Sequence, residues 1–378
     1  MSEKIISLTQ QSLNRRQFLK IAAASTAAIA IAPSLTACAP SKYPELITST
    51  WNTPFQAGSE AASTYRELIR MATLAASSHN SQPWYFTVKE NVIRIHPDKN
   101  RALPVVDPFD RELYISLGCA LENMAIAAAQ AGLTAQTDLF PQNENDTLRV
   151  TLTSSQNASE TALFNAIPMR QCTRGLYNQQ NVPAADRNKL ESIELQKGVS
   201  MQILDTPSQI DALVNLIIAG NQVQYSDREY IDELIGWLRF NEAEAVETMD
   251  GLFSRCSGNP TVPRFLGKMF VASSKPESVS KTDEEKIRSS AGMVSIATEM
   301  DSPQDWVNAG RAVQRFALTA TSLGIKVVFL NQPIEVPEVR AQLANTLDQA
   351  SYPQLLLRFG YSDPMPVSLR RPVESVIL

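Results

Sequence analysis

The spacing of apolar positions along the chain predicts short strands interspersed with longer helices. Short apolar or alternating runs predict strands, and apolar residues at helical spacing predict helices. The predicted strands cover residues 84–88, 92–96, 133–140, 148–152, 293–298, 327–330 and 354–359. The predicted helices cover residues 59–76, 108–132, 184–192, 208–225, 227–249 and 303–323. Because helices and strands alternate throughout, we expect an α+β or α/β protein, and we favour α+β.

One helical pattern occurs twice. The segment from Gly118 to Gly132 returns, without a gap, from Gly310 to Gly324, 192 residues later. Small or apolar residues occupy positions i, i+3, i+7, i+10 and i+14 of both copies, on a helix face that lets two backbones come close. Two alanine-rich amphipathic helices can resemble each other by chance, but the shared order of helix, glycine and strand favours duplication. A duplicated chain is expected to form a fused pseudo-dimer with a site between its halves.

The N-terminus has the pattern of an export signal. The segment Asn14–Lys20 carries Arg15 and Arg16 before Phe18, and a twelve-residue apolar stretch, Ile21–Ala32, follows. That stretch is too short to span a bilayer. We therefore predict a twin-arginine signal, which the twin-arginine translocase would read during export. This route carries proteins that fold before export, many of them with a cofactor already bound.

Residues Leu35–Cys38 resemble a lipobox, in which a cysteine becomes the first residue of the mature chain and receives lipid. The alternative is a plain small-residue cleavage site with an incidental cysteine. We favour lipidation of Cys38, which would place the protein at an extracytoplasmic membrane face, in the periplasm, held by its lipid anchor alone.

These features suggest a division of the chain. The predicted parts are a signal peptide at 1–37, a tether at 38–58, one half at 59–165, and a second half at 166–378 with an irregular candidate lid at 251–282. Without residues 1–37 the 378-residue chain has 341 residues, and because the removed segment carries +3, the net charge falls from −5 to −8. So acidic a chain has no electrostatic basis for binding nucleic acid.

Composition also argues against two kinds of catalytic site. The only histidines are His79 and His96, so we expect no zinc site or other metal. The sequence has no Gly-x-Ser-x-Gly pattern, which argues against a serine hydrolase.

Two segments carry candidate chemistry. The first, residues 75–84, gathers small polar groups and the amides of Asn80 and Gln82 between a helix and a strand. Side-chain amides both donate and accept, which suits the edge of a planar heterocycle. The second is an arginine set, which consists of Arg170, Arg174, Arg370 and Arg371. Converging arginines make a phosphate clamp, whereas a solvated loop and a surface salt bridge are the alternatives.

These segments resemble the signatures of the nitroreductase family of flavin enzymes. Residues Ser77–Trp84 resemble its Pro-Ser-x-x-Asn-x-Gln-Pro-Trp motif, and Arg170-x-Cys172-x-Arg174 resembles its Arg-x-Ser-x-Arg phosphate motif. The resemblance covers roughly residues 60–378 and is closest to tandem, single-chain members of the family, among them a mycobacterial dormancy-associated protein. It implies the family fold, with two fused halves that mimic the family homodimer.

The resemblance also implies a cofactor, FMN, and its ligands. Arg170, Arg174, and Arg370 or Arg371 would hold the phosphate, and Cys172, in the place of the motif serine, would be a further cofactor-binding residue. Ser77, Asn80 and Gln82 would contact the isoalloxazine and the ribityl chain, and Asn331 and Gln332 stand where the family has a Glu-Gly pair near flavin N5. One complete site would form across the halves, while its symmetry mate would be lost. The chain departs from the motifs at Ala76, Cys172 and Gln332, which replace proline, serine and glycine.

The expected function is that of an exported FMN-dependent oxidoreductase. Two electrons would pass through flavin N5 to a small nitro- or quinone-like acceptor, and the protein needs no acid–base pair, so we assign no catalytic residue. Because nicotinamides are cytoplasmic, the electron donor is left open. The alternatives are a flavin-binding or flavin-sequestering protein without turnover and a lipid-anchored solute-binding protein. We expect a monomeric pseudo-dimer.

Overall fold

The computed structural model describes residues 41–378 except 59, 143–145, 156–159 and 348–350. Residues Lys42–Leu378 form one compact unit, to which everything below refers. The predicted signal peptide, its apolar stretch and Cys38 lie outside the described residues.

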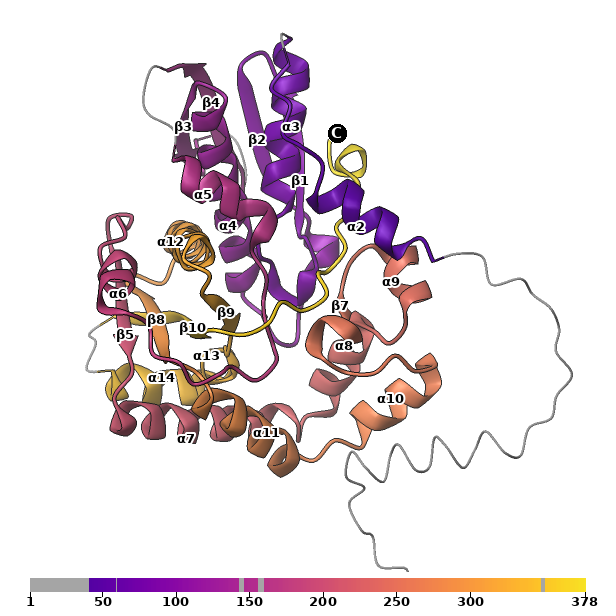
Figure 1. The fold of residues 1–378 in the computed structure, drawn as a ribbon, viewed down its shortest axis with the longest axis vertical. Coiled ribbons are helices and arrows are strands. Elements are labelled where there is room, and N and C mark those ends of the chain that lie inside the picture. The colour runs from indigo at the N-terminus through magenta and orange to yellow at the C-terminus, as the bar shows by residue number, and fades with distance from the viewer. Residues whose placement is uncertain (1–40, 59, 143–145, 156–159, 348–350) are drawn as a thin grey trace, which may run out of the picture. The chain divides into compact units, whose positions relative to one another are not determined.

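Two four-stranded antiparallel sheets have the same topology (Figure 1). The first has the order β1-β2-β4-β3 and the second the order β5-β8-β10-β9. Their strands are β1 (Trp84–Lys89), β2 (Val92–Pro97), β3 (Leu133–Leu139), β4 (Leu148–Ser154), β5 (Val199–Leu204), β8 (Gly292–Thr298), β9 (Lys326–Phe329) and β10 (Tyr352–Gly360). In each half, a long helix ends at a glycine and leads into the edge strand, β3 or β9. The α+β class and the two-half arrangement are thus confirmed.

The helices account for most of the remaining elements. They are α2 (Tyr43–Trp51), α3 (Ala61–Thr73), α4 (Arg111–Gln130), α5 (Thr161–Ala166), α6 (Ala184–Glu191), α7 (Pro207–Gln224), α8 (Arg228–Trp237), α9 (Glu242–Thr248), α10 (Arg264–Ala272), α11 (Pro276–Arg288), α12 (Pro303–Ser322), α13 (Gln332–Glu335) and α14 (Pro337–Thr346). Short 3₁₀ turns lie at η1 (Ser78–Asn80), η2 (Lys99–Arg101), η3 (Ile167–Met169), η4 (Ser254–Ser257) and η5 (Val373–Ser375).

Helices α4 and α12 are the repeated helices, and they cross at their glycines. A Cβ on Gly118 would lie 2.1 Å from the carbonyl oxygen of Val307, and a Cβ on Gly310 would lie 2.0 Å from that of Ile115. Val307 follows Ile115 by the same 192 residues that separate the two glycines. The contact is therefore two-fold symmetric, as at the interface of a homodimer.

The polar pairs next to this crossing follow the same symmetry. Glu122 receives the guanidinium of Arg315 with an N···O distance of 2.7 Å, and Gln314 donates to Asn123 at 2.7 Å. Gln314 corresponds to Glu122, and Arg315 to Asn123, under the 192-residue repeat. One symmetric contact has therefore become an ion pair on one side and a neutral hydrogen bond on the other.

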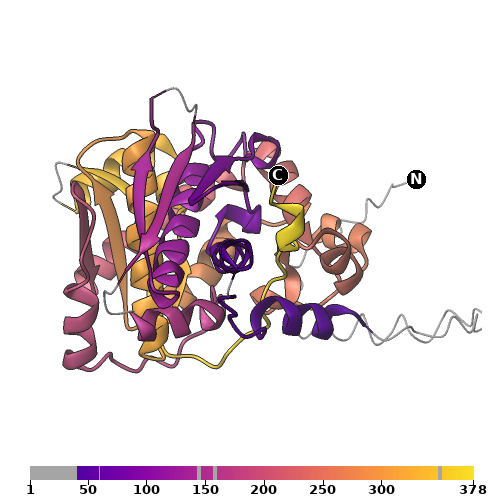
Figure 2. The same cartoon turned by 90° about the horizontal axis from the view of Figure 1, so that it is seen from above.

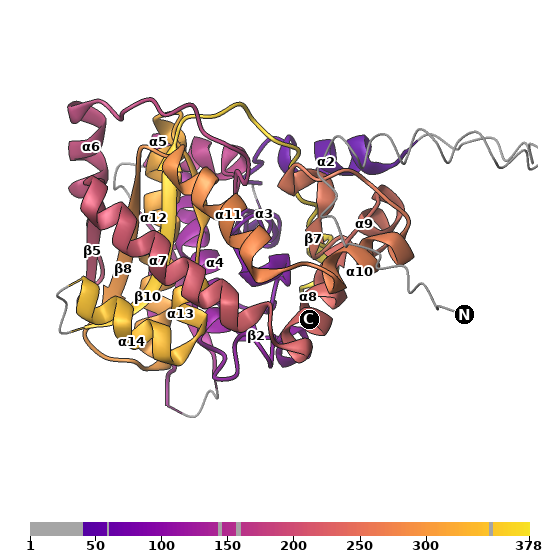
Figure 3. The same cartoon turned by 90° about the horizontal axis from the view of Figure 1, so that it is seen from below.

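The second sheet is buried on both faces. Every residue of β8 is buried, as expected for a central strand covered on both sides. Met293 packs into the core under α7, α11, α13 and α14 (Figure 3), whereas Val294 joins the core formed with α4 and α12.

The last residues of the chain complete the sheet of the first half. The amide of Phe86 donates to Val376 at 2.7 Å, and the amide of Leu378 donates back to Phe86 at 2.9 Å. The C-terminal segment thereby ends at the outer edge of β1, against half one (Figure 2).

Three predictions about local structure were wrong. The tether segment 38–58 contains α2, which docks on the body: Trp51 is 4% exposed and donates to Ser368 at 3.0 Å. The single helix expected over 227–249 is broken between α8 and α9 by β6 (Leu238–Arg239). The region 251–282 is not irregular, because it holds β7 (Leu252–Phe253), η4, α10 and the start of α11.

Candidate functional site

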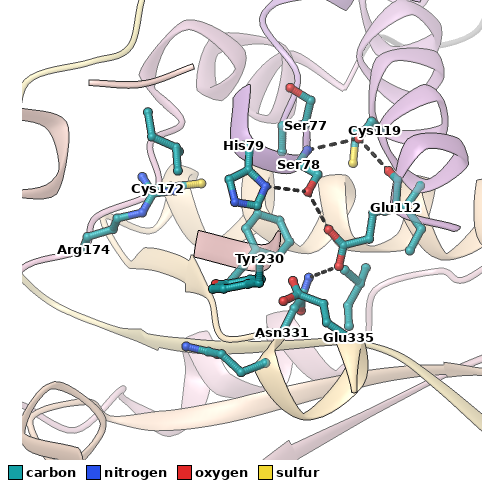
Figure 4. A pocket seen from close by; sticks show the side chains of 17 residues that line it. Ser77, Ser78, His79, Glu112, Cys119, Cys172, Arg174, Tyr230, Asn331 and Glu335 are labelled. Carbon is teal, nitrogen blue, oxygen red and sulfur yellow. Dashed lines mark hydrogen bonds between the residues drawn. The ribbon is translucent and has the colours of Figure 1, made fainter. Parts of the chain in front are cut away.

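A cavity of about 200 Å³ lies where the two halves meet (Figure 4). The loop at residues 77–84, called the signature loop below, and the start of α4 form its wall on the side of half one. The segment around Cys172 and the chain leading into α13 supply its wall from half two. Its lining includes Ser77, Ser78, His79, Glu112, Cys119, Cys172, Arg174, Tyr230, Asn331, Gln332 and Glu335. Of the ten cofactor-binding residues predicted from the sequence, Ser77, Cys172, Arg174, Asn331 and Gln332 line this cavity. The other five do not.

The signature loop is held in a strained conformation. His79, Asn80 and Gln82 have φ angles of 48°, 53° and 53°, in the left-handed region. Each such residue costs on the order of 1–2 kcal/mol, and strain of this kind concentrates at functional sites. The hydroxyl of Ser77 accepts the amide of Gln82 at 3.1 Å and helps to fix the turn.

The two signature amides bind protein backbone. Asn80 donates to the carbonyls of Gly251 and Leu369 at 3.0 and 3.2 Å, and it lines only the arginine end described next. Gln82 is fully buried, donates to Met249 at 2.9 Å and accepts the amide of Arg371 at 2.8 Å. Gln82 therefore lies behind the cavity wall, where it holds the loop to half two.

An arginine end adjoins the cavity. A smaller space of about 50 Å³ shares Ser77, Cys172 and Arg174 with the main cavity and is also lined by Arg170 and Arg370. None of the three arginines has a carboxylate within ion-pair distance in the described part of the chain.

The hydrogen bonds of these arginines differ. Arg370 is 6% exposed and donates to Thr73 at 3.0 Å and to the side chain of Asn80 at 2.7 Å. Arg170 donates to Leu74 at 3.0 Å, but its buried Nε has no partner among the described residues. Burial and the neighbouring Arg170 lower the pKa of Arg370 to about 9. Neighbouring cations without a counter-charge have the chemistry that suits binding of an anion.

The other predicted residues divide between the cavity and its support. Asn331 lines the cavity, donates to Glu112 at 3.1 Å and accepts the amide of Leu356 at 3.1 Å. Gln332 lines it too and donates to Asp283 at 3.3 Å. Arg371 lies outside both spaces and donates to the carbonyls that flank Pro83, those of Gln82 and Trp84. Its burial lowers its pKa to about 10.

An acidic end, which sequence reasoning missed, faces the arginine end across the cavity (Figure 4). Ser78 donates to Glu112 at 2.6 Å, and Glu335 lines the same wall. Burial, with the charge of Glu112 beside it, raises the pKa of Glu335 well above its usual range. Burial also lowers the pKa of His79 to about 4. A lone glutamate in each half gives no sequence signal, because only the fold brings the two together.

The cavity cysteines differ in their surroundings. Cys119 is buried and donates to the carbonyl of Gly310 at 3.3 Å, and its burial raises its pKa to about 12. It remains a thiol at neutral pH and belongs to the helix crossing. Cys172 is partly exposed, and the guanidinium of Arg170 lies 3.7 Å from its sulfur.

Relatives of known name match most of the chain. A Mycobacterium tuberculosis protein named "Putative NAD(P)H nitroreductase Rv3131" is 28% identical over 84% of this chain and 91% of its own length. A second protein of that organism, named nitroreductase acg, is 24% identical over 82% of this chain and 94% of its own. The resemblance to the nitroreductase family and to its single-chain mycobacterial members is thereby confirmed.

Two further comparisons concern the N-terminus and solved structures. Residues 12–32 match the model of the twin-arginine translocation pathway signal sequence, which confirms the predicted signal. The crystal structure of the FMN-dependent nitroreductase NfnB from Mycobacterium smegmatis in complex with NADPH covers 57% of this chain and 96% of its own, with 12% identity and a TM-score of 0.37. Among the described residues, no helix is both long and apolar enough to cross a membrane.

Proposed function

We propose that this chain is an exported, FMN-dependent oxidoreductase that reduces a small nitro- or quinone-like acceptor by two electrons. Similarity to named nitroreductases over most of the chain supports the reaction class. The observation that carries the proposal is the arginine end, which opens into a larger cavity bounded by both halves.

The residues present fit a flavin mononucleotide. A phosphate between Arg170 and Arg174 would supply the acceptor that the buried Nε of Arg170 lacks and the counter-charge that Arg370 lacks. Arg370 would act mainly through its charge, because its guanidinium already donates hydrogen bonds to protein oxygens. Ser77 and Cys172 line both spaces and would contact the part of the cofactor between phosphate and ring.

When bound, FMN supplies hydride transfer, which no side chain of this site provides. The protein would position the ring and keep water from it. The segment 251–282 contributes Leu252 to both spaces and Cys256 to the arginine end, and so would cover the bound cofactor. Asn80 and Gln82 would fix this cover in place rather than touch the ring, since their amides bind the backbone of residues 249–251.

We also propose the cellular setting. The twin-arginine signal supports export, and lipidation of Cys38 would hold the mature chain at the outer face of the membrane, in the periplasm. The donor there would be a membrane quinol or a partner protein. The halves 59–165 and 166–378 would have arisen by duplication and would act together as one monomer, as the symmetric crossing of Gly118 and Gly310 suggests.

The visible absorption spectrum of residues 39–378, purified after folding in the cytoplasm, tests the proposal. We expect flavin bands that bleach under anaerobic NADPH or a soluble quinol. Bands that only dithionite bleaches would replace turnover with flavin storage. A colourless protein that takes up no added FMN would overturn the flavin proposal and favour a solute-binding protein.

A further inference from the structure

The acidic end of the cavity is built by two carboxyl groups from opposite halves. Glu112 comes from the first turn of α4 and Glu335 from the end of α13 (Figure 4). Both line the cavity, opposite the arginine end. Neither residue belongs to the motifs that support FMN binding, so their role needs a separate explanation.

Glu112 is surrounded by donors. Besides Ser78 at 2.6 Å, it accepts Asn331 at 3.1 Å and the guanidinium of Arg111 at 3.0 Å. A carboxylate accepts several such bonds, whereas a carboxylic acid must use one oxygen as a donor. Both carboxyl oxygens of Glu112 therefore accept hydrogen bonds from neighbouring side chains.

Glu335 has the opposite surroundings. The side-chain amide of Gln224 donates to it at 2.5 Å, and no cation forms an ion pair with it among the described residues. Burial and the adjacent charge of Glu112 both favour its neutral form. The pair thus resembles a dyad that holds one proton between two carboxyl groups.

A cluster of buried amides lies behind Glu335. Asn221 and Gln332 both donate to Asp283, at 3.0 and 3.3 Å. The carbonyl oxygens of Asn221, Gln224 and Gln332 are buried and have no donor among the described residues. Buried acceptors of this kind are normally satisfied by water or by a protonated acid. The cluster therefore places three side-chain oxygens beside Glu335 that can accept hydrogen bonds from water or from a protonated acid.

We propose that Glu335, paired with Glu112, donates the proton that the acceptor needs when it is reduced in this cavity. The inference rests on the proposed function. A quinone-like acceptor that received a hydride at one carbonyl oxygen, supplied by bound FMN, would become a hydroquinone anion with its negative charge on the second oxygen. The second oxygen forms an O–H bond with the proton of Glu335, which becomes a carboxylate. Solvent returns that proton to Glu335, so charge and atoms balance.

A pH effect near neutral pH must be assigned to one of the ionisable groups around Glu335. Glu112 and Arg111 from α4, Tyr225 just after α7 and Tyr230 from α8 interact with Glu335. His79 from η1 lines the same cavity, and Asp283 from α11 belongs to the amide cluster. Burial keeps His79 and both tyrosines neutral between about pH 5 and 9, since it lowers the pKa of His79 to about 4 and raises that of Tyr225 to about 12. A pH effect in this range therefore reports the carboxyl groups.

The first test reads the proton directly. Infrared spectra of residues 39–378 at pH 7, with and without flavin, are expected to show a carboxylic acid C=O band that E335Q removes. E338Q, at an exposed glutamate three positions later, should keep the band. If E335Q leaves the band intact, or if no band exists at pH 7, the shared proton is disproved. Because the band does not require FMN, this result is independent of the proposed function.

The second test follows acceptor reduction by stopped flow. We expect E335Q to bind FMN and to be photoreduced as the parent chain is, but to reduce a quinone at least tenfold more slowly and without its alkaline decline. D107N is the control, since burial and Glu112 raise the pKa of Asp107 to about 6 while it stays outside the cavity. It should keep the alkaline decline.

The variant E335D, which has a shorter acidic side chain, controls for a purely structural effect of E335Q. E335D should keep the infrared band and restore part of the lost rate, whatever E335Q does to the fold. If E335Q reduces quinone at the parental rate with the parental pH profile, the proton donor lies elsewhere. If no variant, nor the parent chain, binds FMN, the proposed function fails while the infrared test still decides the shared proton.

Discussion

The two halves of the molecule share an architecture but differ in their chemistry. Their sheets have the same strand order, and their long helices cross through the matched glycines Gly118 and Gly310. The strained loop at 77–82 comes from half one, however, and the three arginines of the arginine end come from half two. At matched positions, buried Glu112 of half one corresponds to exposed Gln304 of half two. The two halves are thus symmetric in packing where backbones touch, whereas their polar residues differ.

The largest expected effect tests the symmetric part of this comparison. Gly118→Ala and Gly310→Ala each place a methyl group about 2 Å from a backbone carbonyl oxygen of the other helix. The helices must separate, so each substitution should lower the free energy of unfolding by about 3 kcal/mol, although alanine favours a helix. Urea unfolding measures both. A loss under 1 kcal/mol at one glycine and a large loss at the other would show that the crossing is not symmetric.

The next effect tests where the symmetry has been lost. Glu122→Gln removes the charge that Arg311 and Arg315 share at the helix interface, at 2.9 and 2.7 Å. We expect a loss of about 2 kcal/mol, because the partly buried guanidinium of Arg311 loses its counter-charge, whereas Arg315 keeps its ion pair with Glu160.

At the matched position, Gln314→Met leaves Asn123 without the neutral bond it accepts at 2.7 Å. A loss of about 1 kcal/mol is expected there. Equal losses at Glu122 and Gln314 in urea unfolding would mean that the two sides of the interface have not diverged in strength.

A third prediction concerns the chemistry of half two alone. Arg174 lines both spaces and forms no hydrogen bond or ion pair with the described part of the chain, so its charge is available to a phosphate. Arg174→Ala should weaken FMN binding about 10- to 100-fold, which corresponds to about 2 kcal/mol for a charged hydrogen bond. Fluorescence titration with FMN measures the affinity.

Arg228→Ala serves as the control, because that arginine is 69% exposed and pairs with Asp232 on the surface of α8. It should leave the affinity unchanged. If both variants bind FMN as the parent chain does, the arginine end does not hold the phosphate.

The sequence predicted much of this architecture for a physical reason. Most strands alternate in burial or form short apolar runs, and both repeated helices end at glycines, so local patterns sufficed. Strand β5 was missed because five of its six residues are only partly buried or exposed. The break between α8 and α9 was missed because tertiary contacts impose it. Arg239 forms an ion pair with Asp250 at 2.6 Å and lies over Trp237.

The site was predictable only in part. The motifs identified the loop and the arginines. In the structure, however, Gln82 and Arg371 form hydrogen bonds with backbone carbonyls and amides and do not line the cavity. The pairing of Glu112 with Glu335 was invisible, because it depends on how the halves meet. Local sequence thus predicts elements and motifs, whereas the direction in which a side chain points depends on packing between distant segments.

The smallest expected effect uses the same glycine-to-alanine change away from the helix crossing. Gly132 and Gly324 end the two long helices with φ angles of 72° and 75°, and no atom lies within 4 Å of an added Cβ at either position. Only the left-handed conformation opposes alanine, at about 1–2 kcal/mol, and the reduced freedom of the unfolded chain offsets part of that cost. Gly132→Ala and Gly324→Ala should therefore each lower stability by about 1 kcal/mol and by the same amount. A threefold difference between them in urea unfolding would mean that the matched helix ends are no longer equivalent, and the symmetry would then be confined to the crossing of Gly118 and Gly310.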